Sequence, residues 1–110
     1  MKKTQETLRK DVSTKTAVLH VAFELSNSKW KLGFSDGNKM RFKSIDARNL
    51  EQLGEEIEKA KSRFRLDDDV RIVSCYEAGR DGFWLHRYLL SHGIANVVVD
   101  SSSIEVNRRK

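Results

Sequence analysis

The sequence of 110 residues predicts one α/β domain built on a mixed five-stranded sheet. Three observations predict this fold class. The first half of the chain has three short strand patterns separated by turn residues, which favours antiparallel hairpins. The second half alternates helical and strand patterns, which favours parallel strands joined by helices. An apolar content of 38% in so short a chain is enough for one core and excludes a second domain.

The chain opens with a polar segment, residues 1–16, which is basic and lacks apolar periodicity, so we expect a poorly ordered leader. The first strand is predicted over residues 17–25, where a nearly continuous apolar run indicates burial on both faces. Within this run His20 is expected to be a buried core residue, and Glu24 is the one carboxylate.

Two further strands are predicted over residues 29–34 and 40–45, where apolar and polar residues alternate with a period of two. The turn between them contains Asp36 followed by Gly37, a pair that is favoured in tight hairpins. The first three strands are therefore expected to form an antiparallel meander.

The period then changes to that of an amphipathic helix over residues 50–64, with acidic side chains early and basic side chains late. Asp46 or Asn49 is available as its N-cap. A buried strand, a helix and another buried strand are predicted next, over residues 70–76, 83–92 and 94–99. This order of elements is the topology of the ribonuclease H fold, parts of which other folds share.

Charge and hydropathy restrict the class of function. The net charge of +5 comes wholly from the two ends of the chain, because residues 17–100 carry 13 basic and 13 acidic side chains. Basic ends suit contact with nucleic-acid phosphates, although short basic tails also serve simply as solubilising ends. No stretch approaches the ~20 apolar residues of a membrane span. The leader also lacks the apolar core of a secretory signal, so a cytoplasmic protein without membrane contact is expected.

Glu24 and Glu77 are the candidate catalytic residues, because each places a carboxylate near the end of an apolar strand, where an unpaired charge is costly. In a ribonuclease H-like sheet these two strands are neighbours, so both side chains can reach one face. Convergent carboxylates repel each other unless a cation such as Mg²⁺ or Mn²⁺ lies between them, and such ions support phosphoryl transfer. The alternative is structural, with Glu24 paired to Lys29 or Lys31 and Glu77 paired to Arg80.

Residues 75–89 contain Tyr-Glu-Ala-Gly followed by Gly-Phe-Trp-Leu, and this stretch resembles the signature of the DEDD transposases related to the Piv DNA invertases. Residues 22–26, 29–30 and 97–109 resemble other parts of the same family, so the resemblance covers residues 17–110. Proteins of that family are bacterial insertion-sequence enzymes with a RuvC-like amino-terminal domain and a carboxy-terminal domain that carries a serine. Members use a structured RNA to bridge donor and target DNA.

The resemblance implies that residues 17–110 form the RuvC-like domain of a DNA transposase, which cleaves and transfers DNA strands with Mg²⁺ (or Mn²⁺) during transposition of an insertion sequence. It implies that Glu24 stands in place of the family's first acid, which is usually Asp, and that Glu77 stands in place of the second. It also implies DNA as a partner, a structured guide RNA as a second partner, and a homo-oligomer for the full-length protein. Three basic residues near the end are expected to contact the nucleic-acid backbone: Arg108, Arg109 and Lys110.

The family's third and fourth acids form an Asp-x-x-Asp pair that comes after the position of Lys110, and the serine domain follows them. The polypeptide is therefore expected to be a truncated domain that is catalytically incomplete. Asp100 is either a third metal ligand or, before three serines, the first residue of a turn. The alternative function is a non-catalytic module that binds nucleic acid or oligomerises, or else a gene remnant.

Overall fold

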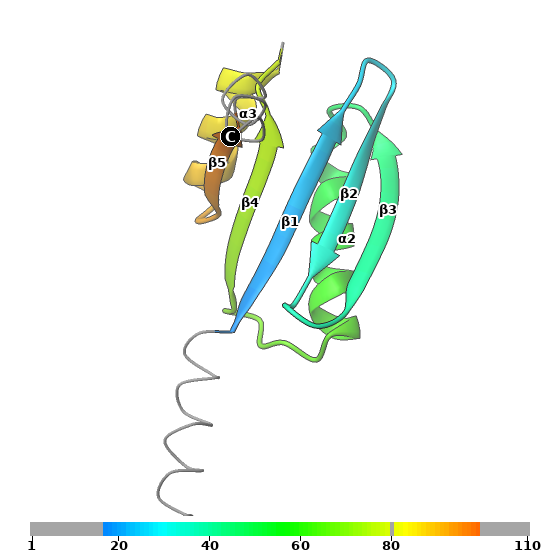
Figure 1. Ribbon diagram of the computed structural model, residues 1–110, viewed down its shortest axis with the longest axis vertical. Coiled ribbons are helices and arrows are strands. Elements are labelled where there is room, and N and C mark those ends of the chain that lie inside the picture. The colour runs from blue at the N-terminus through cyan, green and yellow to red at the C-terminus, as the bar shows by residue number, and fades with distance from the viewer. Residues whose placement is uncertain (1–16, 80, 100–110) are drawn as a thin grey trace, which may run out of the picture.

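The computed structural model describes residues 17–79 and 81–99, which form one mixed sheet with two helices packed on it (Figure 1). The expected leader, residues 1–16, lies outside this part. The strands are β1 (Val18–Leu25), β2 (Lys29–Ser35), β3 (Met40–Asp46), β4 (Arg71–Glu77) and β5 (Ala95–Val99). The helices are α2 (Leu50–Arg63) and α3 (Gly82–Ser91). The predicted α/β class and mixed five-stranded sheet are confirmed.

The strands lie in the order β3-β2-β1-β4-β5. β1 is antiparallel to β2, and β2 is antiparallel to β3. β4 is parallel to both β1 and β5. The order in the sheet differs from the order along the chain, because the chain leaves β3 through α2 and returns to pair with β1. This arrangement is compatible with a ribonuclease H-like fold, and it places the carboxyl ends of β1 and β4 side by side.

The start of α2 is fixed by Asn49, whose side-chain oxygen accepts a hydrogen bond from the backbone N–H of Gln52 at 3.0 Å. Asp46, the other candidate cap, instead accepts a hydrogen bond from Lys29 Nζ at 2.7 Å. Of the two N-cap candidates, Asn49 is therefore the one that the structure uses. Neither described helix is long and apolar enough to cross a lipid bilayer.

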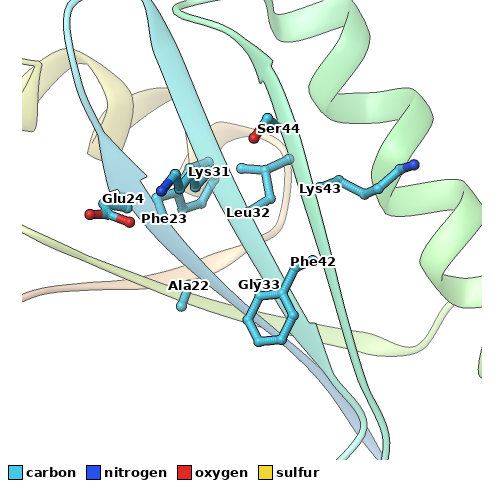
Figure 2. A pocket seen from close by; sticks show the side chains of 9 residues that line it. All are labelled: Ala22, Phe23, Glu24, Lys31, Leu32, Gly33, Phe42, Lys43 and Ser44. Atoms are coloured by element: carbon cyan, nitrogen blue, oxygen red, sulfur yellow. The ribbon is translucent and has the colours of Figure 1, made fainter.

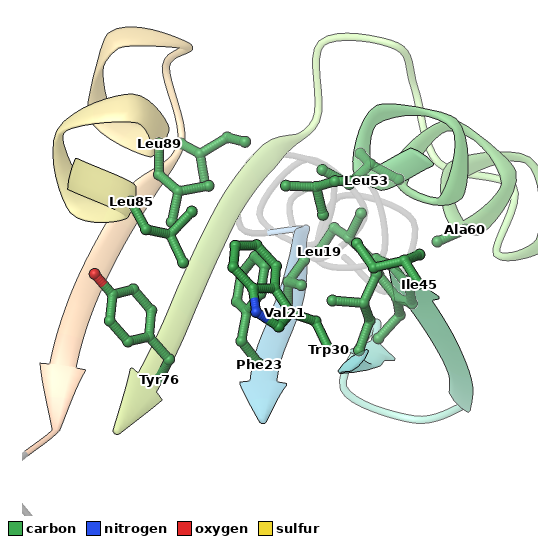
Figure 3. Packing of buried hydrophobic residues seen from close by; sticks show 14 residues of the cluster. Leu19, Val21, Phe23, Trp30, Ile45, Leu53, Ala60, Tyr76, Leu85 and Leu89 are labelled. Atoms are coloured by element: carbon green, nitrogen blue, oxygen red, sulfur yellow. The ribbon is translucent and has the colours of Figure 1, made fainter. Parts of the chain in front are cut away.

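Both helices pack on the same face of the sheet, and the hydrophobic core forms between them and that face (Figure 3). Each large apolar side chain that is fully buried there contributes roughly 1.5–3 kcal/mol through loss of contact with water. The core residues are Leu19, Val21, Phe23, Trp30, Leu32, Phe34, Ile45, Leu53, Ile57, Ala60, Tyr76, Leu85, Leu89 and Ile94.

The expectation that the apolar strands are buried on both faces is wrong for the described residues. Burial alternates along β1, where His20, Ala22 and Glu24 are exposed, and Val97 in β5 is 57% exposed. The reason is that α2 and α3 cover the same side, so nothing within residues 17–79 and 81–99 covers the other side, which we call the open face. His20 is therefore a surface residue, not a core histidine, and the thiol of Cys75 is only partly buried.

Candidate functional site

Glu24 and Glu77 occupy adjacent positions on the open face, at the ends of two neighbouring parallel strands. Phe23 pairs with Tyr76 in the register of β1 and β4, and both of these residues are buried beneath the helices. Side chains alternate along a strand, so the next residue on each strand points to the opposite face. Neighbouring strands are about 4.8 Å apart, which brings the two carboxylates within reach of one shared cation.

The two carboxylates line one hollow at the carboxyl ends of β1 and β4. Both glutamates are exposed to solvent, so the cost expected for a carboxylate buried in an apolar strand does not arise. The other lining residues come from the ends of the two strands and the turns after them: Phe23, Leu25, Ser26, Asn27, Ala78, Gly79 and Asp81.

The structural alternative for Glu24 finds no support in the contacts. Neither glutamate side chain forms an ion pair or hydrogen bond with any residue in the described part of the chain. Lys29 is 2.7 Å from Asp46 instead. Lys31 lies directly opposite Glu24 in the antiparallel register, yet the two form no ion pair. The proposed partner of Glu77, Arg80, lies outside the described residues.

Asp81 is a third carboxylate at this hollow, and the sequence alone did not single it out. Its side chain is only 8% exposed. Its Oδ1 atom accepts hydrogen bonds from Trp84 Nε1 at 2.9 Å and from Arg48 Nε at 3.3 Å. A buried carboxylate needs such donors, because leaving it unpaired costs several kcal/mol. The sequence signal for this contact is the spacing of Asp81 and Trp84, three residues apart at the start of a helix.

Arg48, in the turn between β3 and α2, contacts Asn27 and Asp81, two residues that line the hollow. Besides pairing with Asp81, it donates from Nη1 to the backbone oxygen of Asn27 at 3.4 Å. The φ angle of Arg48 is 65°, in the left-handed region, where a non-glycine residue is strained by about 1 kcal/mol. The contacts of the Arg48 side chain with Asn27 and Asp81 offset this strain. The same contacts link the β3–α2 turn to the β1–β2 and β4–α3 turns.

An aromatic cluster supports the ends of β1 and β4 from the helix side (Figure 3). The Phe23 ring lies edge-on to Trp30 and to Tyr76, with centroids 6.1 Å away in each case. Trp30 in turn stacks on Trp84 at 6.1 Å. Burial raises the pKa of the Tyr76 hydroxyl above its usual value, even though hydrogen bonds to that group act in the opposite direction. The cluster therefore packs on the helix side of the strand ends that carry Glu24 and Glu77.

The donor set fits a hard divalent cation in part. Carboxylate oxygens are the ligands that Mg²⁺ and Mn²⁺ prefer, and Mg²⁺ commonly binds through one or two carboxylates while keeping several waters. No group of three or more His, Cys, Asp or Glu side chains is placed to hold a metal ion anywhere in the described ranges. Asp81 Oδ1 already accepts hydrogen bonds from Arg48 and Trp84, which leaves Glu24 and Glu77 as the carboxylates of the hollow that have no hydrogen-bonding partner in the described residues. Four other residues expected to act here or on nucleic acid lie outside those ranges, namely Asp100, Arg108, Arg109 and Lys110.

Comparison of the sequence with known proteins finds a similar protein. No family model matches the sequence. The chain is 36% identical over 97 residues to a protein of Sinorhizobium fredii (strain NBRC 101917 / NGR234) named "Putative transposase y4rJ". The matched region covers 84% of this chain and 24% of that protein. The chain therefore spans about a quarter of the length of the relative.

Proposed function

We propose that this chain is part of a DNA transposase and forms its RuvC-like amino-terminal catalytic domain, which takes part in cleavage and transfer of DNA strands during transposition of an insertion sequence. The observation that carries the proposal is the convergence of Glu24 and Glu77 on one face at neighbouring strand ends. The similarity to the Sinorhizobium protein and the resemblance of the segment around Glu77 to the DEDD signature support the same family.

In this proposal Glu24 and Glu77 hold Mg²⁺ or Mn²⁺. Glu24 and Glu77 would hold the cation through their carboxylate oxygens, and the cation would supply Lewis-acid activation of a phosphodiester there. The chain contributes two carboxylates whose spacing is set by strand pairing, and Phe23 and Tyr76 anchor that spacing from below. Glu24 is one methylene longer than the Asp usual in the DEDD family, and its exposed position leaves room for the longer side chain.

One observation favours a second candidate function, which is nucleic-acid binding without cleavage. Only two carboxylates with no hydrogen-bonding partner line the hollow within residues 17–79 and 81–99. Such a pair leaves most of the coordination sphere of a cation to water or phosphate. A chain with this pair can therefore bind DNA through a metal ion without completing the reaction.

The test of the proposed function is a calorimetric titration of Mg²⁺ and Mn²⁺ into the wild-type chain and the Glu77→Gln variant. We expect Glu77→Gln to weaken metal binding by about tenfold or more, because the site loses one of its two charged ligands. Asp68→Asn, in the acidic run after α2, is the matched control and should bind metal as the wild type does. Equal affinities in wild type and Glu77→Gln would exclude the assigned role of Glu77.

A DNA-cleavage assay with Mn²⁺ then separates the two candidate functions. Cleavage by the wild type that is lost in Glu77→Gln supports the catalytic function. Metal-dependent DNA binding without cleavage supports the second candidate for this stretch of the protein.

A further inference from the structure

The open face of the sheet carries a row of polar side chains that leads to the candidate site. Ser44 in β3 pairs with Lys31 in β2, and Lys31 pairs with Glu24 in β1. Glu77 in β4 is the next position beyond Glu24, because Phe23 and Tyr76 are paired just before them. The row therefore crosses four strands at right angles and ends at the two carboxylates. We call it the polar row.

A second row, two residues away along the strands, is apolar. Phe42 in β3 pairs with Gly33 in β2, Gly33 pairs with Ala22 in β1, and Ala22 pairs with Cys75 in β4. The Phe42 ring reaches to 3.2 Å from the place where a Cβ of Gly33 would lie, so the ring leans over the glycine. Even so, Phe42 remains 70% exposed. We call this row the apolar row.

The two rows meet in a hollow over β1, β2 and β3 (Figure 2). This hollow shares Phe23 and Glu24 with the hollow that Glu77 lines, so a ligand lying across the sheet reaches both. Its lining residues are Ala22, Phe23, Glu24, Lys31, Leu32, Gly33, Phe42, Lys43 and Ser44.

Lys31 provides the positive charge of the polar row. It forms no ion pair within the described residues, whereas Lys29, two positions earlier on the same face, is held by Asp46 at 2.7 Å. The Lys43 side chain points away from Phe42 and toward α2 (Figure 2). Lys31 is therefore free to meet a phosphate beside the exposed Ser44 hydroxyl.

We propose that the open face binds a single strand of DNA that crosses β3, β2 and β1 toward Glu24 and Glu77, an inference that rests on the proposed function. Lys31 and Ser44 contact its phosphates, and one of its bases stacks on Phe42. The rows lie about 6.8 Å from each other along the strands, which separates a sugar-phosphate backbone from its bases. Proteins bind single strands in this way, by cationic side chains along the backbone and aromatic rings under the bases. A duplex is a poorer fit, since its bases are already stacked.

The test is fluorescence anisotropy with a labelled single-stranded DNA of about 12 nucleotides and the 110-residue protein in a chelating buffer. We expect Phe42→Ala to weaken binding by about 5- to 150-fold, the loss typical of one stacked base. Phe42→Tyr should retain binding, and Phe42→Leu should lose it as Ala does, because stacking needs a ring. Lys31→Ala should reduce the slope of log affinity against log salt by about 0.7.

Two variants on the helix side serve as controls. Leu90→Ala removes an exposed apolar side chain, and Lys59→Ala removes an exposed lysine with the same loss of charge as Lys31→Ala. Both should bind DNA as the wild type does. Circular dichroism spectra should be the same for all variants, because Phe42 and Lys31 are exposed and lie outside the core.

The outcomes separate this inference from the proposed function. If the wild type binds DNA but Phe42→Ala and Lys31→Ala bind equally well, the open face is not the binding surface, while the metal titration at Glu77 is unaffected. If the wild type binds no DNA with or without Mg²⁺, the inference fails, while the metal titration at Glu77 still decides the proposed function. Tighter binding of duplex DNA or of RNA of the same sequence also overturns the inference. The inference is also overturned if Phe42→Ala abolishes self-association of the chain but leaves its DNA affinity unchanged. The open face would then be covered by a second copy of the chain.

Discussion

A partly buried ion pair joins α2 to the edge strand β3. Its removal should lower the free energy of unfolding by an amount that depends on pH. Arg41 Nη1 donates to Glu56 Oε1 at 3.0 Å, and the two side chains are only 14% and 10% exposed. Burial by itself raises the pKa of Glu56. The hydrogen bond from Arg41 and the positive charges of Lys59, Arg41 and Lys43 outweigh burial, so the pKa of Glu56 lies below its usual value.

The structure sets the size of the effect of Glu56→Gln. Breaking a fully buried pair costs roughly 3–5 kcal/mol, and breaking an exposed pair costs roughly 0–1 kcal/mol. With both side chains mostly but not fully buried, we expect Glu56→Gln to lower the free energy of unfolding by about 1–3 kcal/mol at neutral pH. Because the folded-state pKa of Glu56 is lowered, this contribution is present above the unfolded-state pKa of about 4.3 and is lost as pH falls through the folded-state pKa.

The assay is urea denaturation of wild type and Glu56→Gln at neutral pH and at a series of acid pH values. The difference in unfolding free energy should shrink as the pH falls below about 4.3. Glu55→Gln, an exposed neighbour on the same helix, is the control and should leave stability nearly unchanged at every pH. Equal stability of Glu56→Gln and wild type at neutral pH, or a difference that does not change with pH, would refute the reasoning.

Three further predictions concern the site and its supports. Asp81→Ala should lower the free energy of unfolding by about 1–3 kcal/mol, because it leaves the Trp84 N–H without its acceptor; an unchanged urea midpoint would contradict this. Asn49→Ala should cost about 1 kcal/mol through loss of the bond to the Gln52 N–H, measured by thermal unfolding, and Asn49→Ser should recover most of it. Burial raises the pKa of Tyr76, so the stabilisation that depends on its neutral hydroxyl is complete below about pH 10 and is lost as pH rises through the folded-state pKa. Stability of the wild type should therefore fall more steeply in that range than stability of Tyr76→Phe, and parallel alkaline unfolding curves would argue against it.

The sequence was sufficient for the order of elements and for the convergence of the two glutamates. Strand and helix periods are local properties, so each segment can be identified from its own residues. The pairing of β1 with β4 follows from the topology expected for three meander strands and two helix-strand units. Once these strands are neighbours, alternation places Glu24 and Glu77 on one face.

Other features depend on contacts that no local pattern contains. The apolar run of β1 predicted burial on both faces, but the run does not say whether a second layer is present, and His20 and Ala22 are exposed. Asp81 is bound by Arg48, 33 residues away in the sequence, so its role follows only from the folded chain. The polar and apolar rows likewise depend on the strand registers, in which a shift of one residue would turn Phe42 to the other face.

A double-mutant cycle of Mn²⁺ affinity, measured by electron paramagnetic resonance on wild type, Glu24→Gln, Glu77→Gln and the double variant, tests most directly whether the two carboxylates share one cation. If they do, each single variant should lose much of the affinity, and the double variant should lose clearly less than the sum of the two single losses. Unchanged affinity in either single variant, or losses that simply add, would contradict a shared site at the ends of β1 and β4.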